Sequence, residues 1–355
     1  MPDAAPLPQD AARSAARAVL DRLWAPGREF LGCAVAIMGG GMSWVSERNL
    51  TAAISNAGGF GVLACGSMGP GELEAEIAGT QEKTTRPFGV NLITMHPALD
   101  ELIRVSVNAG VGHVVLAGGI PSAAAVRTVK DGGAKLVCFA PALVLARRLM
   151  RSGADALVIE GSEAGGHIGP VSLTVLAQEI LPHVREVPVF VAGGLGRGEA
   201  VLAYLEIGAA GAQLGTRFAA AAESIAHPRF KAAFIRASAR DAVPSVQLDP
   251  RFPVIPVRGL ANAGSKRFLE HQRETVRLWE AGELTREAAQ LSIERFWAGA
   301  LRRAVIDGDV EHGSVMAGQS VGLVNAVQPV AEIIAEIVGQ AVAALVARHM
   351  IATPG

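Results

Sequence analysis

The feature that most constrains the fold of this chain is a series of short apolar runs, bounded by glycine or proline, between residues 33 and 216. The runs are CAVAIMGGG (33–41), FGVLACGS (60–67), FGVNLIT (88–94), HVVLAGG (113–119), KLVCFAP (135–141), ALVIEGS (156–162), VPVFVAGG (187–194) and AGAQLGT (210–216). They begin roughly 20 to 30 residues apart, which is the length of one strand, one helix and two loops. Because the runs lack polar alternation, they predict strands covered on both faces, as in a parallel sheet.

The stretches between these runs have the composition of helices. Examples are ERNLTAAISNAG, PGELEAEIAGTQEK, PSAAAVRTVKDGG, PALVLARRLMRSGA and GRGEAVLAYLEIGA. Several open with proline or serine and end at glycine, as helix start and stop chemistry predicts. Eight strands that alternate with helices predict a (β/α)8 TIM barrel. A doubly wound parallel sheet is the structural alternative, because alternation alone does not show closure, and the count of eight favours the barrel.

In residues 217 to 310 the alternation of apolar runs with helical stretches stops. The proline-rich stretch DPRFPVIPVRG (249–259) precedes two charged helical stretches there. We therefore expect four parts: an N-terminal helical extension (1–30), a barrel (31–220), a mainly helical subdomain over the catalytic face (221–310), and a return segment to the active site with a closing C-terminal helix (311–355).

Charge and cysteine content narrow the class of protein. The formal net charge of −1 gives no electrostatic footprint for nucleic acid or an anionic membrane. Cys33, Cys65 and Cys138 lie in apolar runs without a CxxC pair, which predicts buried thiols in a reducing compartment. The N-terminus has no continuous apolar signal core, and the late apolar stretch carries Glu332 and Glu336, which favours a packing helix over a membrane span. We expect a cytoplasmic protein.

Glycine clusters follow several of the predicted strands, where the catalytic loops of a barrel lie. AGGLGRGEA (192–200) runs from a strand into a helix. Its Gly193 and Gly194, with Gly215 and Thr216 after the last strand, therefore predict a phosphate-binding cradle. Its glycine spacing differs from that of a Rossmann fingerprint. The alternative is that these glycines only make tight turns.

His167 in EGSEAGGHIG is the candidate proton-transfer residue. It follows a predicted strand at the catalytic edge, and imidazole titrates near neutral pH. The alternative is a solvated loop histidine without a role. No HxH, HExxH or acid–histidine pattern has metal spacing, and no GxSxG elbow occurs, so the sequence predicts neither a catalytic metal nor a serine nucleophile.

This segment is one of several that resemble a known family. EGSEAGGHIG, with GGGMSWVSERNLTAAISNAGGFGVL, FGVNLIT, FVAGGLGRGEA and QLGTRFAAAAES, closely resembles the nitronate monooxygenase (2-nitropropane dioxygenase) superfamily, which includes the FMN-dependent bacterial enoyl-ACP reductase. The similarity covers roughly residues 33 to 325. It implies a barrel that holds FMN non-covalently, with NADH or NADPH as electron donor in the reductase branch.

The resemblance also implies residue roles. His167 matches the catalytic histidine of the family. The implied cofactor-binding residues are Gly40, Gly41, Met42, Asn91, Glu160, Gly165, Gly166, Gly193, Gly194, Gly215, Thr216, Ser314 and Gln319. Gly40, Gly41 and Met42 would line the flavin ring, and Asn91 would contact the ring or the ribityl chain.

Two reactions remain open within the family. In the favoured one, the enzyme oxidises alkyl nitronates or nitroalkanes with O₂ to a carbonyl compound and nitrite, with His167 moving the α-proton or orienting the substrate. In the other, it acts as an NAD(P)H-dependent enoyl-thioester reductase with an acyl carrier protein as partner, or as an NAD(P)H:flavin oxidoreductase. The stretch 297–324 resembles the reductase branch, whereas the proline-rich insertion and the chain length resemble the monooxygenase group.

A third reading comes from a different class, an FMN-binding barrel without turnover. His167 among glycines argues against it, because a storage site needs no group that titrates near pH 7. The long apolar C-terminal helix is compatible with a monomer or with a homodimer contact.

Overall fold

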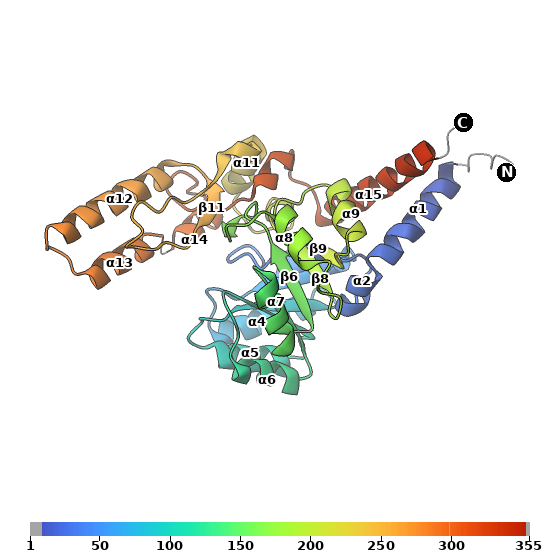
Figure 1. Cartoon of the computed structure of the whole chain (residues 1–355), viewed down its shortest axis with the longest axis horizontal. Coiled ribbons are helices and arrows are strands. Elements are labelled where there is room, and N and C mark those ends of the chain that lie inside the picture. The colour runs from blue at the N-terminus through green and yellow to red at the C-terminus, as the bar shows by residue number, and fades with distance from the viewer. Residues whose placement is uncertain (1–8, 298, 353–355) are drawn as a thin grey trace.

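The centre of the molecule is a ring of parallel strands, seen in a computed structural model that describes residues 9–297 and 299–352 (Figure 1). The strands lie in the order β1-β9-β8-β6-β5-β4-β3-β2, and a parallel bridge between Met38 and Phe60 joins the two ends. The barrel strands are β1 (Ile37–Gly39), β2 (Gly61–Ala64), β3 (Phe88–Ile93), β4 (His113–Ala117), β5 (Lys135–Phe139), β6 (Ala156–Glu160), β8 (Val189–Ala192) and β9 (Gly211–Leu214). The predicted eight-stranded parallel barrel is confirmed, and the doubly wound alternative is wrong.

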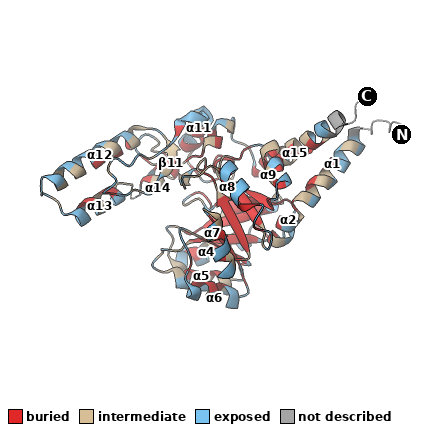
Figure 2. Cartoon of the chain, in the orientation of Figure 1, coloured by how far each residue is buried: buried red, intermediate tan, exposed pale blue. Residues whose placement is uncertain are grey.

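Helices follow the strands and cover the outside of the barrel. They are α3 (Arg48–Asn56), α4 (Pro70–Gln81), α5 (Leu99–Asn108), α6 (Ala123–Asp131), α7 (Leu143–Arg151), α8 (Leu173–Ile180), α9 (Gly198–Glu206) and the short α10 (Thr216–Ala219). Their starts show the expected chemistry, since Pro70 opens α4 and the Ser122 hydroxyl accepts from the Ala125 N–H at 3.1 Å. Figure 2 shows the strands buried and the outer helix faces exposed.

Aromatic rings fill the barrel at the end where its strands begin, and they identify its inner face. The His113 ring of β4 lies 4.9 Å from the Phe60 ring and 5.2 Å from that of Phe30, in α2 (Ala25–Leu31). Phe30 also meets Phe190 of β8, at 6.2 Å. Because β4 and β8 are not neighbours in the sheet, these rings meet inside the ring of strands. The face that carries them is therefore the inner one.

After the barrel, the chain forms more than the helices that the sequence predicts. It includes α11 (Pro228–Arg236), η1 (Ala239–Asp241), β10 (Ala242–Pro244), β11 (Val257–Leu260), α12 (Ala263–Glu280), α13 (Arg286–Arg295) and α14 (Ala300–Val305). Strands β10 and β11 form a three-stranded antiparallel sheet with β7 (Gly166–His167), which lies in the loop after β6. No pattern in the sequence predicted this sheet. The expected boundary at residue 220 stays a prediction, as does the placement of this part over the catalytic face.

The helices α12 and α13 project from the barrel as an arm, here called the helical arm (Figure 1). The arm has a small core of its own, made by Phe252, Phe268, Ala289 and Ile293. This core is separate from the main cluster of buried residues in the barrel.

The chain ends with η2 (Gln319–Leu323) and α15 (Val330–Ala352). Within the described residues, only the stretch Val330–Arg348 is long and apolar enough to cross a membrane, by length and composition alone. In the structure α15 packs against α9 and α1 (Gln9–Leu23), and α1 and α15 lie side by side in Figure 1, as expected of a packing helix. Residues 1–8 of the predicted N-terminal extension and residues 353–355 lie outside the described range.

Two of the three cysteines have the buried environment that the sequence predicts, and Cys33 does not. Cys65 and Cys138 are buried, Cys33 is half-buried, and all three are free thiols. Burial raises the pKa of Cys65 to about 11, so this thiol is unreactive at neutral pH.

Candidate active site

The loops that follow the strands meet at one end of the barrel. The Gly40 N–H donates to the Leu214 carbonyl oxygen at 2.9 Å, which joins the loop after β1 to the end of β9. A Cβ on Gly193 would lie 2.9 Å from the carbonyl oxygen of Gly161, and a Cβ on Gly40 would lie 3.6 Å from the Cα of Gly215. The structure therefore brings the predicted glycine loops after β1, β6, β8 and β9 together.

Three polar side chains point into the barrel at this same end. Register shows their direction: Asn91 lies two residues after Gly89, which pairs with His113, and Glu160 lies two residues after Val158, which pairs with Phe190. By the same rule Gln213 is on the inner face, because its partner Ala192 lies two residues after Phe190. These side chains form a polar layer, here called the inner polar layer, which lies two residues further along the strands than the aromatic rings.

Two members of this layer are nearly closed off from solvent. Asn91 and Gln213 are each 7% exposed, and the Asn91 amide donates to the Val115 carbonyl oxygen at 3.3 Å. A Cβ on Gly41 would come within 2.6 Å of Asn91 Cγ, so the backbone of the GGGMSW loop lies directly on the amide. Gln213 was not predicted, although a polar residue inside the apolar run AGAQLGT was its signal.

Glu160 is the third member and the only ionisable one. It ends β6, is half-buried, and has no hydrogen-bond or ion-pair partner among the residues that the structure describes. Burial raises the pKa of its carboxyl group to about 8. At neutral pH the group is therefore mostly a neutral acid.

His167 sits on a strand and not in a free loop. In β7 it pairs with Val257 of β11, and the next residue, Ile168, donates its N–H to the Pro256 carbonyl oxygen at 3.0 Å. Its side chain is exposed, yet nearby protein atoms desolvate it enough to lower its pKa. The imidazole is therefore neutral at pH 7, and the small sheet fixes the backbone from which it projects.

Arg258 is a functional residue of this region that was not predicted from the sequence. Its Nε donates to the Ser162 carbonyl oxygen at 2.9 Å, and its Nη1 donates to that of Ala242 at 2.6 Å. Burial lowers the pKa of this guanidinium. Arg258 thus ties the proline-rich segment to the loop that carries His167, and it acts as a positioning residue.

The loops predicted to hold phosphate have the required backbone. Gly193 and Gly194 have φ values of +92° and +70°, a conformation that favours glycine. Within residues 9–297 and 299–352, their N–H groups donate to no protein oxygen. Thr216 begins α10 directly after Gly215, and its hydroxyl retains a proton to donate while accepting from the Gly318 N–H at 3.0 Å. Unbonded N–H groups and a hydroxyl beside a glycine turn fit a phosphate group.

The return segment contacts the loop after β6. The Gln319 N–H donates to the Glu163 carbonyl oxygen at 2.9 Å, and a Cβ on Gly165 would lie 2.6 Å from the Ala317 carbonyl carbon. Met316, which was not predicted, bridges to Gly259 of β11, and its Sδ would lie 3.5 Å from a Cβ on Gly166.

Ser314 has a different environment from the one expected. Its backbone N–H donates to the Ala300 carbonyl oxygen at 2.9 Å, which attaches it to the start of α14. No hydrogen bond in the described part of the chain joins its side chain to the glycine loops. Ser314 as a cofactor ligand stays a prediction.

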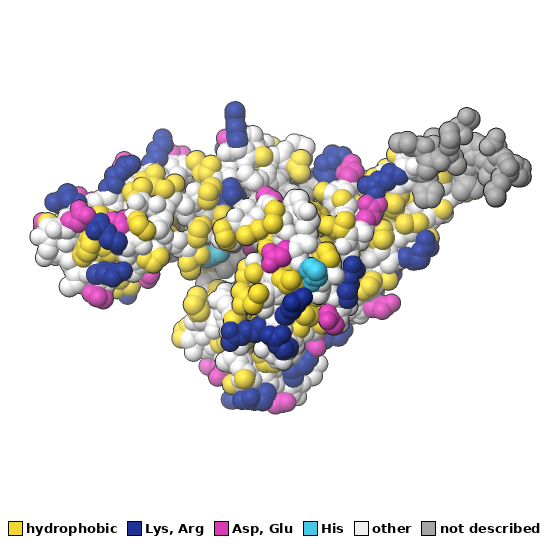
Figure 3. All heavy atoms as spheres, viewed as in Figure 1, with side chains coloured by type: hydrophobic (Ala, Val, Ile, Leu, Met, Phe, Trp, Pro, Cys, Tyr) yellow, Lys and Arg dark blue, Asp and Glu magenta, His cyan; other side chains and the backbone are white. Residues whose placement is uncertain are grey.

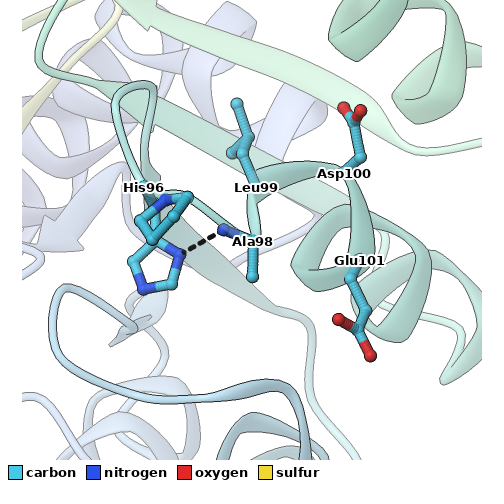
Figure 4. Close-up of a pocket in the computed structure, with 6 residues that line it drawn as sticks. His96, Ala98, Leu99, Asp100 and Glu101 are labelled. Carbon is cyan, nitrogen blue, oxygen red and sulfur yellow. Dashed lines mark hydrogen bonds between the residues drawn. The ribbon is translucent and has the colours of Figure 1, made fainter.

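A separate depression near α5 contains none of the predicted site residues. It is lined by residues 96–101, and His96 Nδ1 accepts from the Ala98 N–H at 3.1 Å (Figure 4). Asp100 and Glu101 point away from His96 in this view. His96 therefore shapes the turn into α5. No group of three or more His, Cys, Asp or Glu side chains within the described chain could hold a metal ion.

The sequence and the fold both match known proteins. A profile of the nitronate monooxygenase family matches residues 27–340. The (3aS,4S,5R,7aS)-5-hydroxy-7a-methyl-1-oxo-octahydro-1H-indene-4-carboxyl-CoA dehydrogenase of Mycobacterium tuberculosis is 30% identical over 346 residues, covering 90% of this chain and 97% of the relative.

Among solved structures, FabK from Thermotoga maritima is 34% identical with a TM-score of 0.82, covering 91% of this chain and 98% of that one. Nitroalkane oxidase from Streptomyces ansochromogenes is 25% identical with a TM-score of 0.73, covering 90% and 99%. The chain therefore belongs to the nitronate monooxygenase family of oxidoreductases.

Proposed function

We propose that this enzyme is an FMN-dependent oxidoreductase that acts on an apolar acyl thioester, reducing an enoyl group with electrons from NADH or NADPH. The observation that carries the proposal is the setting of His167. Its strand pairs with β11, and the segment that runs from β10 to β11 exposes Val243, Val246 and Ile255 to solvent. Figure 3 shows hydrophobic side chains on the surface where the helical arm joins the barrel.

The similarities support a thioester substrate. The named activity of the Mycobacterium tuberculosis relative is that of a carboxyl-CoA dehydrogenase, and FabK is the enoyl-ACP reductase of this family. The identities to these two proteins, 30% and 34%, exceed the 25% to nitroalkane oxidase. We therefore place the thioester reaction before nitronate oxidation, the reverse of the order that the sequence favours.

The residues at the barrel end fit FMN. Gly193, Gly194 and Thr216 offer N–H groups and a hydroxyl for the phosphate, and the backbone of Gly41 lies against Asn91 of the inner polar layer. FMN, when bound, supplies two-electron redox chemistry that no amino-acid side chain provides.

His167 then acts as a neutral hydrogen-bond donor. An imidazole N–H aimed at the thioester carbonyl polarises it and stabilises the negative charge that collects on its oxygen when the double bond is reduced. The lowered pKa of His167 suits this role, because the ring keeps one N–H and adds no positive charge. Strand pairing of β7 and the Arg258 contact to Ser162 hold this group in place.

Nitronate oxidation with O₂ is the second candidate. It is favoured by the family that matches residues 27–340 and by the similarity to nitroalkane oxidase. In that reaction the imidazole of His167 would take the α-proton of a nitroalkane, since its lowered pKa leaves the ring unprotonated and able to act as a base at pH 7.

Anaerobic stopped-flow spectroscopy of the FMN-loaded protein separates the two candidates. NADH, NADPH and propyl-2-nitronate are mixed in separate runs while flavin absorbance is recorded. The proposal predicts rapid bleaching by one nicotinamide and re-oxidation by crotonyl-CoA or crotonyl-acyl carrier protein. Bleaching by the nitronate, with a slow response to both nicotinamides, would establish the second candidate. A protein that binds FMN but is bleached by none of them would be a carrier.

A further inference from the structure

Glu160 occupies an unusual place for a carboxyl group. The strand register places it on the inner face of the barrel, in the inner polar layer with Asn91 and Gln213. Its two strand neighbours at this level are Ala192 of β8 and the Ala140–Pro141 segment after β5, which offer no polar side chain. No hydrogen bond or ion pair occupies it in the described part of the chain.

The ionisable groups of the loop after β6 and of its partner strand β11 are bonded elsewhere or exposed. Glu163 Oε2 accepts from the Leu173 N–H at 3.0 Å, at the start of α8, and Arg258 donates to Ser162 and Ala242. His167 lies on β7, with its side chain exposed. Desolvation accounts for the altered pKa of Glu160, with no contribution from a neighbouring charge.

A carboxyl group in such a place has no protein partner in either of its two forms. An ionised, unpaired carboxylate with no protein donor is costly when partly desolvated, whereas the neutral acid carries an O–H that needs an acceptor. No described protein atom provides that acceptor. Glu160 is half-buried, so water can accept the hydrogen bond in the free protein, and a ligand that displaces this water becomes the group left to accept it.

We propose that Glu160 binds the cofactor as a neutral carboxylic acid, donating its proton in a hydrogen bond to the cofactor, and that ionisation of Glu160 releases the cofactor. This rests on the proposed function, since it takes FMN as the ligand. No atom is transferred: the proton stays on the Glu160 carboxyl while the cofactor is bound and passes to water when the cofactor leaves at high pH.

The proposal predicts a pH dependence of cofactor affinity with a defined sign. The affinity is constant between pH 7 and the pKa of Glu160 near 8, then falls by up to about tenfold per pH unit above it, because only the protonated form binds. His167 does not interfere in this range, because its pKa lies below the ordinary value of 6.5. Riboflavin, which lacks the phosphate, should show the same slope, because the register places the Glu160 side chain on the inner face of the barrel with Asn91 and Gln213.

The experiment is a fluorescence titration of the apoprotein with FMN and with riboflavin from pH 7 to 9.5, with circular dichroism at each pH to check folding. Glu160→Gln keeps an N–H donor without a titrating proton, so it should bind at pH 7 within about threefold of the wild type and show no slope. Glu160→Ala should bind at least tenfold more weakly at pH 7, also without a slope. Glu332→Gln removes an exposed carboxylate of α15 and should retain the wild-type slope.

Infrared difference spectroscopy of the apoprotein gives a second readout that needs no turnover. A protonated carboxylic acid band should be present at pH 7 in the wild type, absent in Glu160→Gln, and shifted when FMN binds. A wild-type slope in Glu160→Gln, or a missing acid band at pH 7, would overturn the proposal. If neither flavin binds at any pH, the proposed function fails together with it. If FMN binds without pH dependence, only the inference on Glu160 fails.

Discussion

The hydroxyl of Thr216 accepts a hydrogen bond from the backbone N–H of Gly318 at 3.0 Å, across 102 residues of sequence. This contact joins the last barrel strand to the return segment. The next residue, Gln319, donates its N–H to the Glu163 carbonyl oxygen. The return segment is therefore bonded both to Thr216 after β9 and to the loop after β6 that leads to His167. The loops proposed to bind the cofactor and the segment that carries His167 are therefore both held by the return segment.

Replacing Thr216 tests this contact. Thr216→Val keeps the side-chain shape but removes the acceptor, so the buried N–H of Gly318 loses its partner at a cost of about 1–3 kcal/mol. The expected result is a lower free energy of unfolding in urea and weaker FMN binding. Thr216→Ser retains the hydroxyl and should keep most of both quantities. Equal losses in the two variants would show that the methyl group matters and the hydrogen bond does not.

Close packing at Gly165 gives a second test. A Cβ there would lie 2.6 Å from both the Ala317 carbonyl carbon and the Gly318 nitrogen, which are backbone atoms that cannot rotate away. Gly165→Ala should therefore displace the return segment, lower the free energy of unfolding by about 1–3 kcal/mol and reduce FMN affinity.

Gly169→Ala is the matched control for this change. It lies in the same stretch, and nothing is within 4 Å of its added methyl group. We expect unfolding and FMN binding close to wild type. A stable Gly165→Ala variant with normal FMN affinity would mean that the return segment gives way without cost.

The barrel could be predicted from the sequence because each strand is local. Runs such as FGVNLIT and HVVLAGG are mostly apolar, since helices cover one face and the barrel interior lies on the other. The glycine loops were also visible, because φ values such as those of Gly193 and Gly194 depend on the residue type itself.

The remaining parts of the site depend on contacts between distant segments. Strand β7 has only two residues and forms because β11, nearly a hundred positions later, pairs with it, so no local pattern revealed it. Arg258 was missed for the same reason, since its partner Ser162 lies 96 residues away. The inward direction of Gln213 becomes clear only from the register with β8.

A substitution at His167 should change turnover without changing FMN affinity. His167→Asn retains a polar side chain but loses the imidazole, so turnover should fall by about 10²–10⁴-fold while FMN affinity stays the same. His183→Asn, an exposed histidine after α8, should retain wild-type turnover. A loss of FMN binding in His167→Asn would assign the residue to the cofactor site and not to the reaction.

The lowered pKa of His167 also sets the acid limit of the reaction. If the neutral ring is the active form, turnover of the wild type should persist as the pH falls to the ordinary value of 6.5 and decline only below it. In steady-state assays from pH 5 to 8, His167→Asn should lack this acidic decline. A wild-type midpoint above 6.5 would show that the imidazole is stabilised as a cation when substrate binds.

The ion pair between Arg217 and Glu336 predicts how acid affects stability. Arg217 is 4% exposed and its Nη2 lies 2.7 Å from Glu336 Oε2, so α10 is anchored to α15. The hydrogen bond from Arg217 is the largest influence that lowers the pKa of Glu336. A carboxyl group with a lowered pKa stabilises the fold above its ordinary value of 4.5, and this contribution disappears as the pH falls through the lowered pKa.

Glu336→Gln should therefore lower the free energy of unfolding at pH 7, and the deficit should shrink toward zero in strongly acidic solution, where the wild-type carboxylate is protonated as well. Breaking a buried pair costs about 3–5 kcal/mol, but the Glu336 side chain is 35% exposed, so solvent offsets part of the loss and we expect about 2 kcal/mol. Urea titrations at pH 7 and pH 3.5 measure both values. Glu332→Gln, one turn earlier on α15 and exposed, should match the wild type at pH 7. A deficit in Glu336→Gln that is the same at both pH values would mean that the amide disturbs packing and that the charge of Glu336 contributes nothing.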